Sequence, residues 1–194
     1  KLDTAIIHVQ KASPDGTCVI LGDEFHDVDI AVAARKVIVT CEEIVSDEFI
    51  RQDPTANKIF GECVNAVVKA PYGAWPSQCY GYYDDDDAAL KEYDKASKYQ
   101  DAEDAVKQLA KAAAKAQKAA DAKPEDEKLA AAAERAKKAA EDAAAGTLIP
   151  ETFKDYLDKW VYSVADQPAL LDKIGGSRLM RLKVEPHLGY STTH

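Results

Sequence analysis

The segment Pro71–Asp87, PYGAWPSQCYGYYDDDD, concentrates side chains that could hold a ligand. Its aromatic residues are interleaved with glycine, proline, serine and glutamine, which fits neither the period of a strand nor that of a helix. A loop rich in glycine and proline that follows a strand is where α/β sheets place ligand contacts. The segment therefore predicts a binding loop, and the main alternative is a hydrophobic lid packed over the sheet edge. The aromatic residues are Tyr72, Trp75, Tyr80, Tyr82 and Tyr83.

Two adjacent carboxylates, Glu42 and Glu43, come at the end of a strand-like run. The carboxyl end of a buried strand is a place where such groups act as acids or bases. A structural ion pair is nevertheless the favoured interpretation. The expected partner is Arg35 or Arg51.

The histidines and the acidic run also favour structural roles. His8 alternates within a strand and is expected to be a hydrogen-bonded core residue, whereas His26 is expected to cap or pack at a helix start. Asp84–Asp87 predicts a solvated acidic turn that leads into the next helix, because acids favour a helix start. The sequence contains no recognisable Ser-His-Asp set, phosphate loop or metal motif.

The four cysteines are widely spaced and form no CxxC pair. Two of them lie in apolar strand-like runs, so buried thiols in a reducing compartment are expected, with a disulfide or a catalytic thiol as alternatives. The spacing fits no zinc motif and no histidine is near, so no metal is expected. The cysteines are Cys18, Cys41, Cys63 and Cys79.

Residues 1–80, which must position these side chains, have the sequence pattern of an α/β protein. Strands are predicted at 4–13, 17–22, 36–45 and 65–71, with a Pro-Asp-Gly turn at 13–17 and a helix at 23–36. The run at 36–45 is almost continuously hydrophobic, as expected for a strand covered on both faces. Strands that alternate with a helix predict an open layered sheet of the Rossmann-like type.

Residues 102–145 differ in kind, because 20 of their 44 positions are alanine and their nine basic and nine acidic residues cancel. Alanine, lysine and glutamate favour helix, so two helices are predicted, joined near 121–123, as an antiparallel hairpin. Pro124 is expected at the first position of the second helix, and Gly146 at its C-terminal cap. Alanine faces bury little area, so the hairpin is expected to be a spacer, an insertion or an engineered arm; partner docking is the alternative.

Residues 147–194 return to ordinary composition. Apolar residues from Phe153 to Val164 have helical spacing, and Gly175-Gly176 would end that helix. The stretch Arg178–Pro186 alternates like a strand, and 187–194 is a short tail. The predicted organisation is one α/β domain, residues 1–101 and 147–194, which carries the hairpin 102–145.

The formal net charge is −9, which argues against nucleic acid and anionic membranes as primary partners. No apolar run is long enough for a membrane span, and the first residues do not predict a signal peptide. A cytoplasmic protein is therefore expected.

Three stretches resemble the A (alpha) subunit of class I CoA-transferases, closest to the glutaconate branch of that family. They are GDEFHDVDIAVAARKVIVTCEEIVSDEFI at 22–50, NAVVKAPYGAWPSQCYGYYD at 65–84 and IGGSRLMRLKVEPHLGY at 174–190. The resemblance is co-linear over roughly 1–100 and 150–190. The Ala-rich stretch has no counterpart in the family pattern.

The resemblance implies a ping-pong transfer by a hetero-oligomer that includes a B subunit. A glutamate carboxylate would attack an acyl-CoA thioester, form an enzyme-bound CoA thioester and pass CoA to an acceptor acid. In the glutaconate branch that glutamate lies in a Ser-Glu-Asn-Gly type motif of the B subunit, and this sequence has no such motif. The glycine-rich signature of the A (alpha) subunit is absent too, so the chain resembles the C-terminal portion. The CoA thioester is the substrate, and no cofactor is expected.

By the same resemblance, the loop at 72–83 would help to shape a pocket for a glutaconyl-like acyl group. The backbone N–H groups of Gly73 and Ala74, with the Ser77 hydroxyl and the Gln78 amide, are the expected contacts for a carboxylate or thioester oxygen. The family pattern usually has histidine where Trp75 stands, which would alter the pocket. The expected substrate-binding residues are Tyr72, Gly73, Ala74, Trp75, Ser77 and Gln78.

Two other functions stay open at this point. One is a structural or engineered scaffold that carries the hairpin and catalyses nothing. The other is a component of an acyl-CoA decarboxylase or hydrolase with the same fold.

Overall fold

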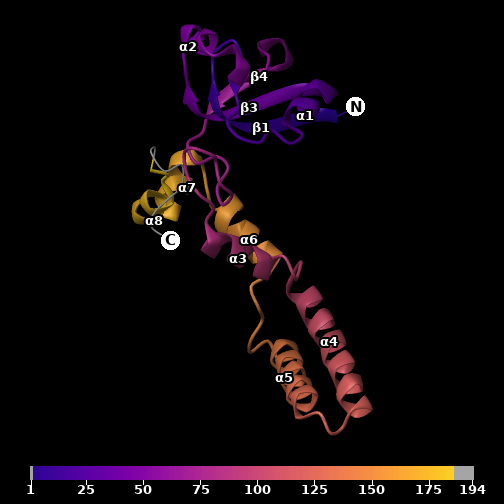
Figure 1. The fold of residues 1–194 in the computed structure, drawn as a ribbon. Coiled ribbons are helices and arrows are strands. Elements are labelled where there is room, and N and C mark those ends of the chain that lie inside the picture. Colours follow the sequence, from indigo (N-terminus) through magenta and orange to yellow (C-terminus); the bar gives the residue numbers. More distant parts are fainter. Residues whose placement is uncertain (1, 186–194) are drawn as a thin grey trace. The chain divides into compact units, whose positions relative to one another are not determined.

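The computed structural model describes residues 2–185, so the predicted tail at 187–194 lies outside the described residues. The chain divides into two compact units, one of residues 1–87 and 166–194 and the other of residues 88–165 (Figure 1). We call them unit 1 and unit 2. Among residues 2–185, every helix is too short or too polar to cross a bilayer.

Unit 1 is built on a mixed five-stranded sheet with the order β4-β2-β1-β3-β5. The three strands β1, β3 and β5 run parallel, and β2 and β4 extend the sheet with antiparallel pairing. This arrangement confirms the predicted open α/β sheet. The strands are β1 (Leu2–Ala12), β2 (Cys18–Val19), β3 (Ala34–Ile44), β4 (Asn57–Ile59) and β5 (Ala66–Lys69).

Alternation along β1 and β3 sorts their side chains to two faces. Ile7 pairs with Val39, and both belong to the hydrophobic core. His8 pairs with Thr40 in the same register and therefore points to the opposite face, with Gln10 and Glu42 further along. The sheet thus gathers polar side chains toward the carboxyl ends of β1 and β3.

Short elements connect these strands. The predicted turn at 13–17 is present, with Gly16 at φ 97°, in the region that favours glycine. The helix predicted at 23–36 is shorter, because Ala34 and the residues after it already pair with β1. The strand predicted at 17–22 is reduced to two residues. The connecting elements are α1 (Asp27–Ala33), α2 (Asp47–Gln52), η1 (Pro54–Ala56) and η2 (Gly61–Cys63).

The helix predicted from residue 151 onward is interrupted. It consists of α6 (Phe153–Leu157), the π-helix η3 (Asp158–Tyr162) and, after a break, α7 (Gln167–Ile174). Asp166 caps α7 by accepting from the Ala169 N–H, so a new helix begins there. Gly175, with φ 92°, ends α7.

The strand predicted at 178–186 is wrong, because Gly176–Leu182 forms the helix α8. Leu179 and Leu182 are three residues apart, which also fits one helix face. Leu182 packs against Cys79 and Tyr83, and this burial favours the helix. Among the described residues of the predicted strand, Lys183, just after α8, makes an isolated bridge with Tyr83.

Unit 2 contains most of α3 (Asp87–Ala96), then α4 (Ala102–Ala122), α5 (Glu127–Ala144), α6 and η3. The two predicted helices are present as α4 and α5, which lie side by side in Figure 1. Pro124 does not begin the second helix as predicted; Asp126 caps it through the Lys128 and Leu129 N–H groups. Gly146 has φ 68° just beyond α5, as a C-terminal cap requires. That 102–145 is an insertion stays a prediction.

Candidate functional site

The aromatic loop, which we define as residues 71–84, follows β5 and covers the polar half of one sheet face. Its backbone and side chains reach three groups on that face: His8, Gln10 and Glu42. The loop is therefore fixed to the sheet by specific polar contacts in addition to packing.

The Glu42 carboxylate is the main anchor of the aromatic loop. Its Oε2 accepts from the Tyr72 N–H at 2.9 Å, and its Oε1 accepts from the Gly73 N–H at 3.3 Å and the Tyr83 hydroxyl at 2.9 Å. His8 Nε2 lies 2.8 Å from the same Oε1. The residue is only 6% exposed, so these donors offset the cost of burying its charge. Glu42 thereby fixes the start and the end of the loop.

The predicted ion pair of Glu42 or Glu43 with an arginine is wrong. Arg35 instead lies 3.4 Å from Asp3. Glu43 contacts Lys11 at 3.7 Å and accepts from the Tyr82 hydroxyl. Glu42 is paired with His8 and with donors of the aromatic loop, and no arginine contact is needed.

His8 is a hydrogen-bonded sheet residue, as predicted. Its Nδ1 lies 2.8 Å from the Thr40 hydroxyl, and its Nε2 contacts Glu42. Its ring also requires glycine above it: a Cβ at Gly73 would lie 2.6 Å from His8 Nδ1 and 2.7 Å from the Ala70 carbonyl oxygen. Gly73 therefore lets the loop backbone approach the sheet closely enough to reach Glu42.

Tyr83 joins the two ends of the aromatic loop. Its ring stacks on that of Tyr72 with centroids 4.6 Å apart, and its hydroxyl accepts from the Ala74 N–H at 2.9 Å while donating to Glu42. Burial, and then the nearby Glu42 charge, raises the pKa of Tyr83. The phenol thus stays protonated and keeps its role as donor.

The middle of the loop is held by a second buried carboxylate, Asp86. It accepts from Trp75 Nε1 at 2.9 Å, and its two oxygens face Arg178 Nη2 at 2.7 Å and Nε at 2.5 Å. Asp86 is 4% exposed, so the prediction of a solvated acidic run is wrong at this position. The reason is that α8 brings Arg178 to the loop, a contact between distant segments that no local pattern shows.

A cavity of about 450 Å³ lies beside the anchored loop. Its polar lining includes His8 and Gln10 from β1. The Gln10 side-chain amide donates to the Leu21 carbonyl and accepts from the Leu21 N–H, and Leu21 also lines the cavity. Asp23 and Asp27 also line the cavity, and burial, followed by the charge of Glu24, raises the pKa of Asp27. The cavity offers several polar groups to a ligand a few atoms across.

The expected substrate-binding residues separate into two groups. Ala74 and Gln78 line the cavity, whereas Tyr72 and Gly73 hold the loop on Glu42. The N–H groups of Gly73 and Ala74, expected to face substrate, already have acceptors in Glu42 and Tyr83.

The other two residues of the expected set lie outside the cavity lining. Trp75 is bonded to Asp86, and Ser77 lies in a turn where its N–H donates to the Ala74 carbonyl. A substrate-binding role for the set of six stays a prediction, with Gln78 as its best-placed polar side chain.

The cysteines of the chain are free thiols, and three of them are buried, as expected; Cys63 is half-buried. Burial raises the pKa of Cys18 and of Cys79 to about 12. Both are therefore protonated at neutral pH and poorly suited to nucleophilic attack.

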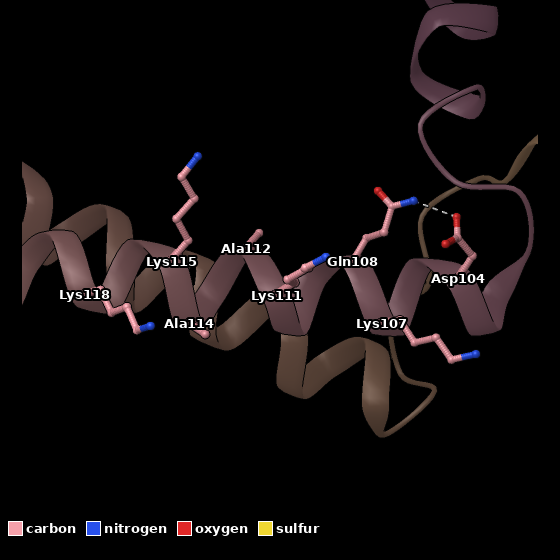
Figure 2. Close-up of a pocket in the computed structure, with 8 residues that line it drawn as sticks. All are labelled: Asp104, Lys107, Gln108, Lys111, Ala112, Ala114, Lys115 and Lys118. Carbon is pink, nitrogen blue, oxygen red and sulfur yellow. Dashed lines mark hydrogen bonds between the residues drawn. The ribbon is translucent and has the colours of Figure 1, made fainter.

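A larger hollow, of about 830 Å³, lies along one side of α4 (Figure 2). All of its lining residues come from this one helix, and its four lysines project from the helix surface. It has no wall from a second element and brings no reactive groups together, so the cavity beside the aromatic loop is the candidate site.

Comparison with known proteins defines the class. No model of a known protein family matches the chain. The chain is 32% identical over 102 residues to the A component of 3-oxoadipate CoA-transferase from Pseudomonas knackmussii, covering 50% of this chain and 33% of that protein. In sequence and fold the chain is similar to the A subunits of CoA-transferases, and the predicted resemblance is confirmed.

A more similar relative is the A component of glutaconate CoA-transferase from Acidaminococcus fermentans. Identity is 44% over 190 residues, which is 98% of this chain and 44% of the relative. The crystal structure of glutaconate CoA-transferase from that organism matches with a TM-score of 0.65 and 43% identity, over 97% of this chain and 44% of that one. The chain thus spans less than half the length of these relatives.

Proposed function

We propose that this chain is part of the A component of an enzyme that transfers CoA from an acyl-CoA to a carboxylic acid. The acyl group is a dicarboxylate like that of glutaconyl-CoA, and the mechanism is ping-pong. The observation that carries the proposal is the cavity beside the aromatic loop, held by Glu42, in a chain 44% identical to the A component of a glutaconate CoA-transferase. The reaction as proposed needs no cofactor beyond the CoA thioester.

The nucleophile is proposed to come from a partner B subunit. Among the described residues near the cavity, Glu42 is engaged by four donors and Cys79 is protonated, so neither is a good nucleophile. Asp23 and Asp27 line the cavity and are the alternative carboxylates. A partner glutamate would attack the thioester carbonyl and expel the CoA thiolate, leaving a mixed anhydride between the glutamate and the acyl group. The thiolate would then attack the glutamyl carbonyl, which forms the enzyme-bound CoA thioester and releases the acyl group as its free carboxylate. The acceptor acid would take up CoA by the same steps in reverse. This chain would shape the acyl pocket and orient the substrate through Gln78.

An exposed apolar part of the sheet supports a partner. Parallel strands are normally covered on both faces. Ile6 is 72% exposed in β1, although this strand lies between β2 and β3, and Val68 in β5 is 45% exposed. Both lie on the same face as His8, in register through Ile38 and Thr40. Covering this face would extend the wall beside the cavity.

The test is a transfer assay on the chain mixed with two further polypeptides: a CoA-transferase B subunit, plus the part of the glutaconate CoA-transferase A component that this chain lacks. The expected result is transfer of CoA from glutaconyl-CoA to acetate with parallel double-reciprocal plots, unchanged in Asp23→Asn and Asp27→Asn. Release of free CoA without an acceptor would indicate a hydrolase, and release of carbon dioxide a decarboxylase. Lack of both complex and transfer would contradict the proposal.

A further inference from the structure

Three ligating side chains that are far apart in sequence meet at the base of the aromatic loop. They are His8 of β1, Glu42 of β3 and Cys79 of the loop, and each offers an atom within 4.8 Å of the other two. Glu42 and Cys79 are buried, and His8 is half-buried. The cysteine spacing did not indicate this group, because His8 and Cys79 are far apart in the sequence.

The surroundings orient these atoms as the surroundings of metal ligands do. The Thr40 hydroxyl, 2.8 Å from His8 Nδ1, leaves Nε2 as the nitrogen that faces Glu42 and the cluster. In metal sites the second ring nitrogen of a ligating histidine is commonly held in this way. Glu42 accepts from the Tyr72 N–H and the Tyr83 hydroxyl, which hold its carboxylate toward the cluster.

We propose that His8 Nε2, Glu42 Oε1 and Cys79 Sγ bind one divalent transition metal ion of the zinc or cobalt type. A mixed set of nitrogen, oxygen and sulfur suits these ions and does not suit magnesium or calcium, which prefer oxygen alone. His8 and Cys79 also line the cavity. The fourth coordination position therefore opens toward the cavity, where water or a ligand oxygen can occupy it.

The rearrangement required is small. Bonds of about 2.0–2.3 Å in a tetrahedral site place ligand atoms roughly 3.4 Å apart. His8 Nε2 and Glu42 Oε1, now 2.8 Å apart, would separate slightly, and ligand atoms that now lie up to 4.8 Å apart would approach. On binding, the Cys79 thiol releases its proton to solvent. The imidazole proton leaves Nε2, which binds the metal, and the neutral ring carries its proton on Nδ1, toward Thr40.

The test is titration of the reduced full-length chain with Co²⁺, followed by absorbance. Binding of one equivalent with a thiolate-to-cobalt charge-transfer band is expected, and Zn²⁺ should displace it. The band should persist in Cys63→Ser, which removes the half-buried thiol outside the cluster, and disappear in Cys79→Ala. Thr40→Val, which removes only the contact to His8 Nδ1, should weaken binding about 10–100-fold.

Absence of the band at stoichiometric Co²⁺, or its survival in Cys79→Ala, would overturn the proposal. If Cys79→Ala fails to fold by circular dichroism, X-ray absorption on the unmodified zinc-bound chain decides. One sulfur neighbour with nitrogen and oxygen is expected. A shell without sulfur, or with two or more sulfurs, would contradict the site.

Discussion

Removing the Tyr83 hydroxyl tests how firmly the aromatic loop is anchored. Tyr83→Phe keeps the stacked ring and deletes one atom, which donates to Glu42 and accepts from the Ala74 N–H. A hydrogen bond to a charged group contributes about 1.5–3 kcal/mol, and an amide left unpaired costs about 1–3 kcal/mol. Since Tyr83 is 1% exposed, water cannot replace either bond. A loss of about 3 kcal/mol in the free energy of unfolding of unit 1 is expected.

The neighbouring Tyr82→Phe is the matched control. Its hydroxyl also donates to a glutamate, Glu43, but that contact is exposed, so a loss below about 1 kcal/mol is expected. Urea unfolding in a Trp160→Phe background leaves Trp75, in the loop, as the fluorescent reporter of unit 1. The urea concentrations at the midpoints of unfolding are compared between variants that have the same dependence of unfolding free energy on urea concentration. Equal losses in the two tyrosine variants would refute the anchoring argument.

Four further predictions follow from the same contacts. Gly73→Ala should destabilise unit 1 by about 1–3 kcal/mol through the clash with His8, while Gly176→Ala, where a Cβ meets open space, should stay within about 0.5 kcal/mol in urea unfolding. Arg178→Met, which removes the ion pair between Arg178 and the buried Asp86, should cost about 3 kcal/mol. Lys107→Ala, which removes an exposed ion pair, should cost under about 0.5 kcal/mol. The Thr152 hydroxyl and N–H hold the pKa of Asp155 below its usual value of 3.8, so the ionised carboxylate stabilises unit 2 above that pH, and this stabilisation is lost as pH falls through the folded-state pKa. The difference in Tm between the unmodified chain and Asp155→Asn should therefore vanish in acid. A difference that stays constant with pH would contradict this reasoning. Deleting residues 102–145 should leave the Trp75-reported unfolding of unit 1 unchanged, and a shifted midpoint would show that the hairpin is not a passive insertion.

The central strands and the hairpin were predictable because their signals are local and long. β-Branched runs define β1 and β3, and alanine with lysine defines α4 and α5. Short elements were not predictable in this way. In α8, Met180 and Leu182 fit an alternating pattern, whereas Leu179 and Leu182 fit a helical one, and burial of Leu182 against Tyr83 decided between them.

The candidate site was predictable only in part. The composition of the aromatic loop indicated that it belongs to a site, but it did not show that its backbone N–H groups face Glu42. Likewise, Asp86 looked like one of four equivalent acids until α8 supplied Arg178. Contacts between segments distant in the sequence determine which polar groups remain available to a ligand.

The measurement that tests the proposed function most directly is the location of the covalent CoA. The assembled enzyme is incubated with glutaconyl-CoA without an acceptor, and the mass of each polypeptide is determined under denaturing conditions. A mass increase equal to CoA minus one water on the partner polypeptide, with none on this chain, is the predicted result. CoA attached to this chain, or steady thioester turnover by this chain alone, would contradict the account.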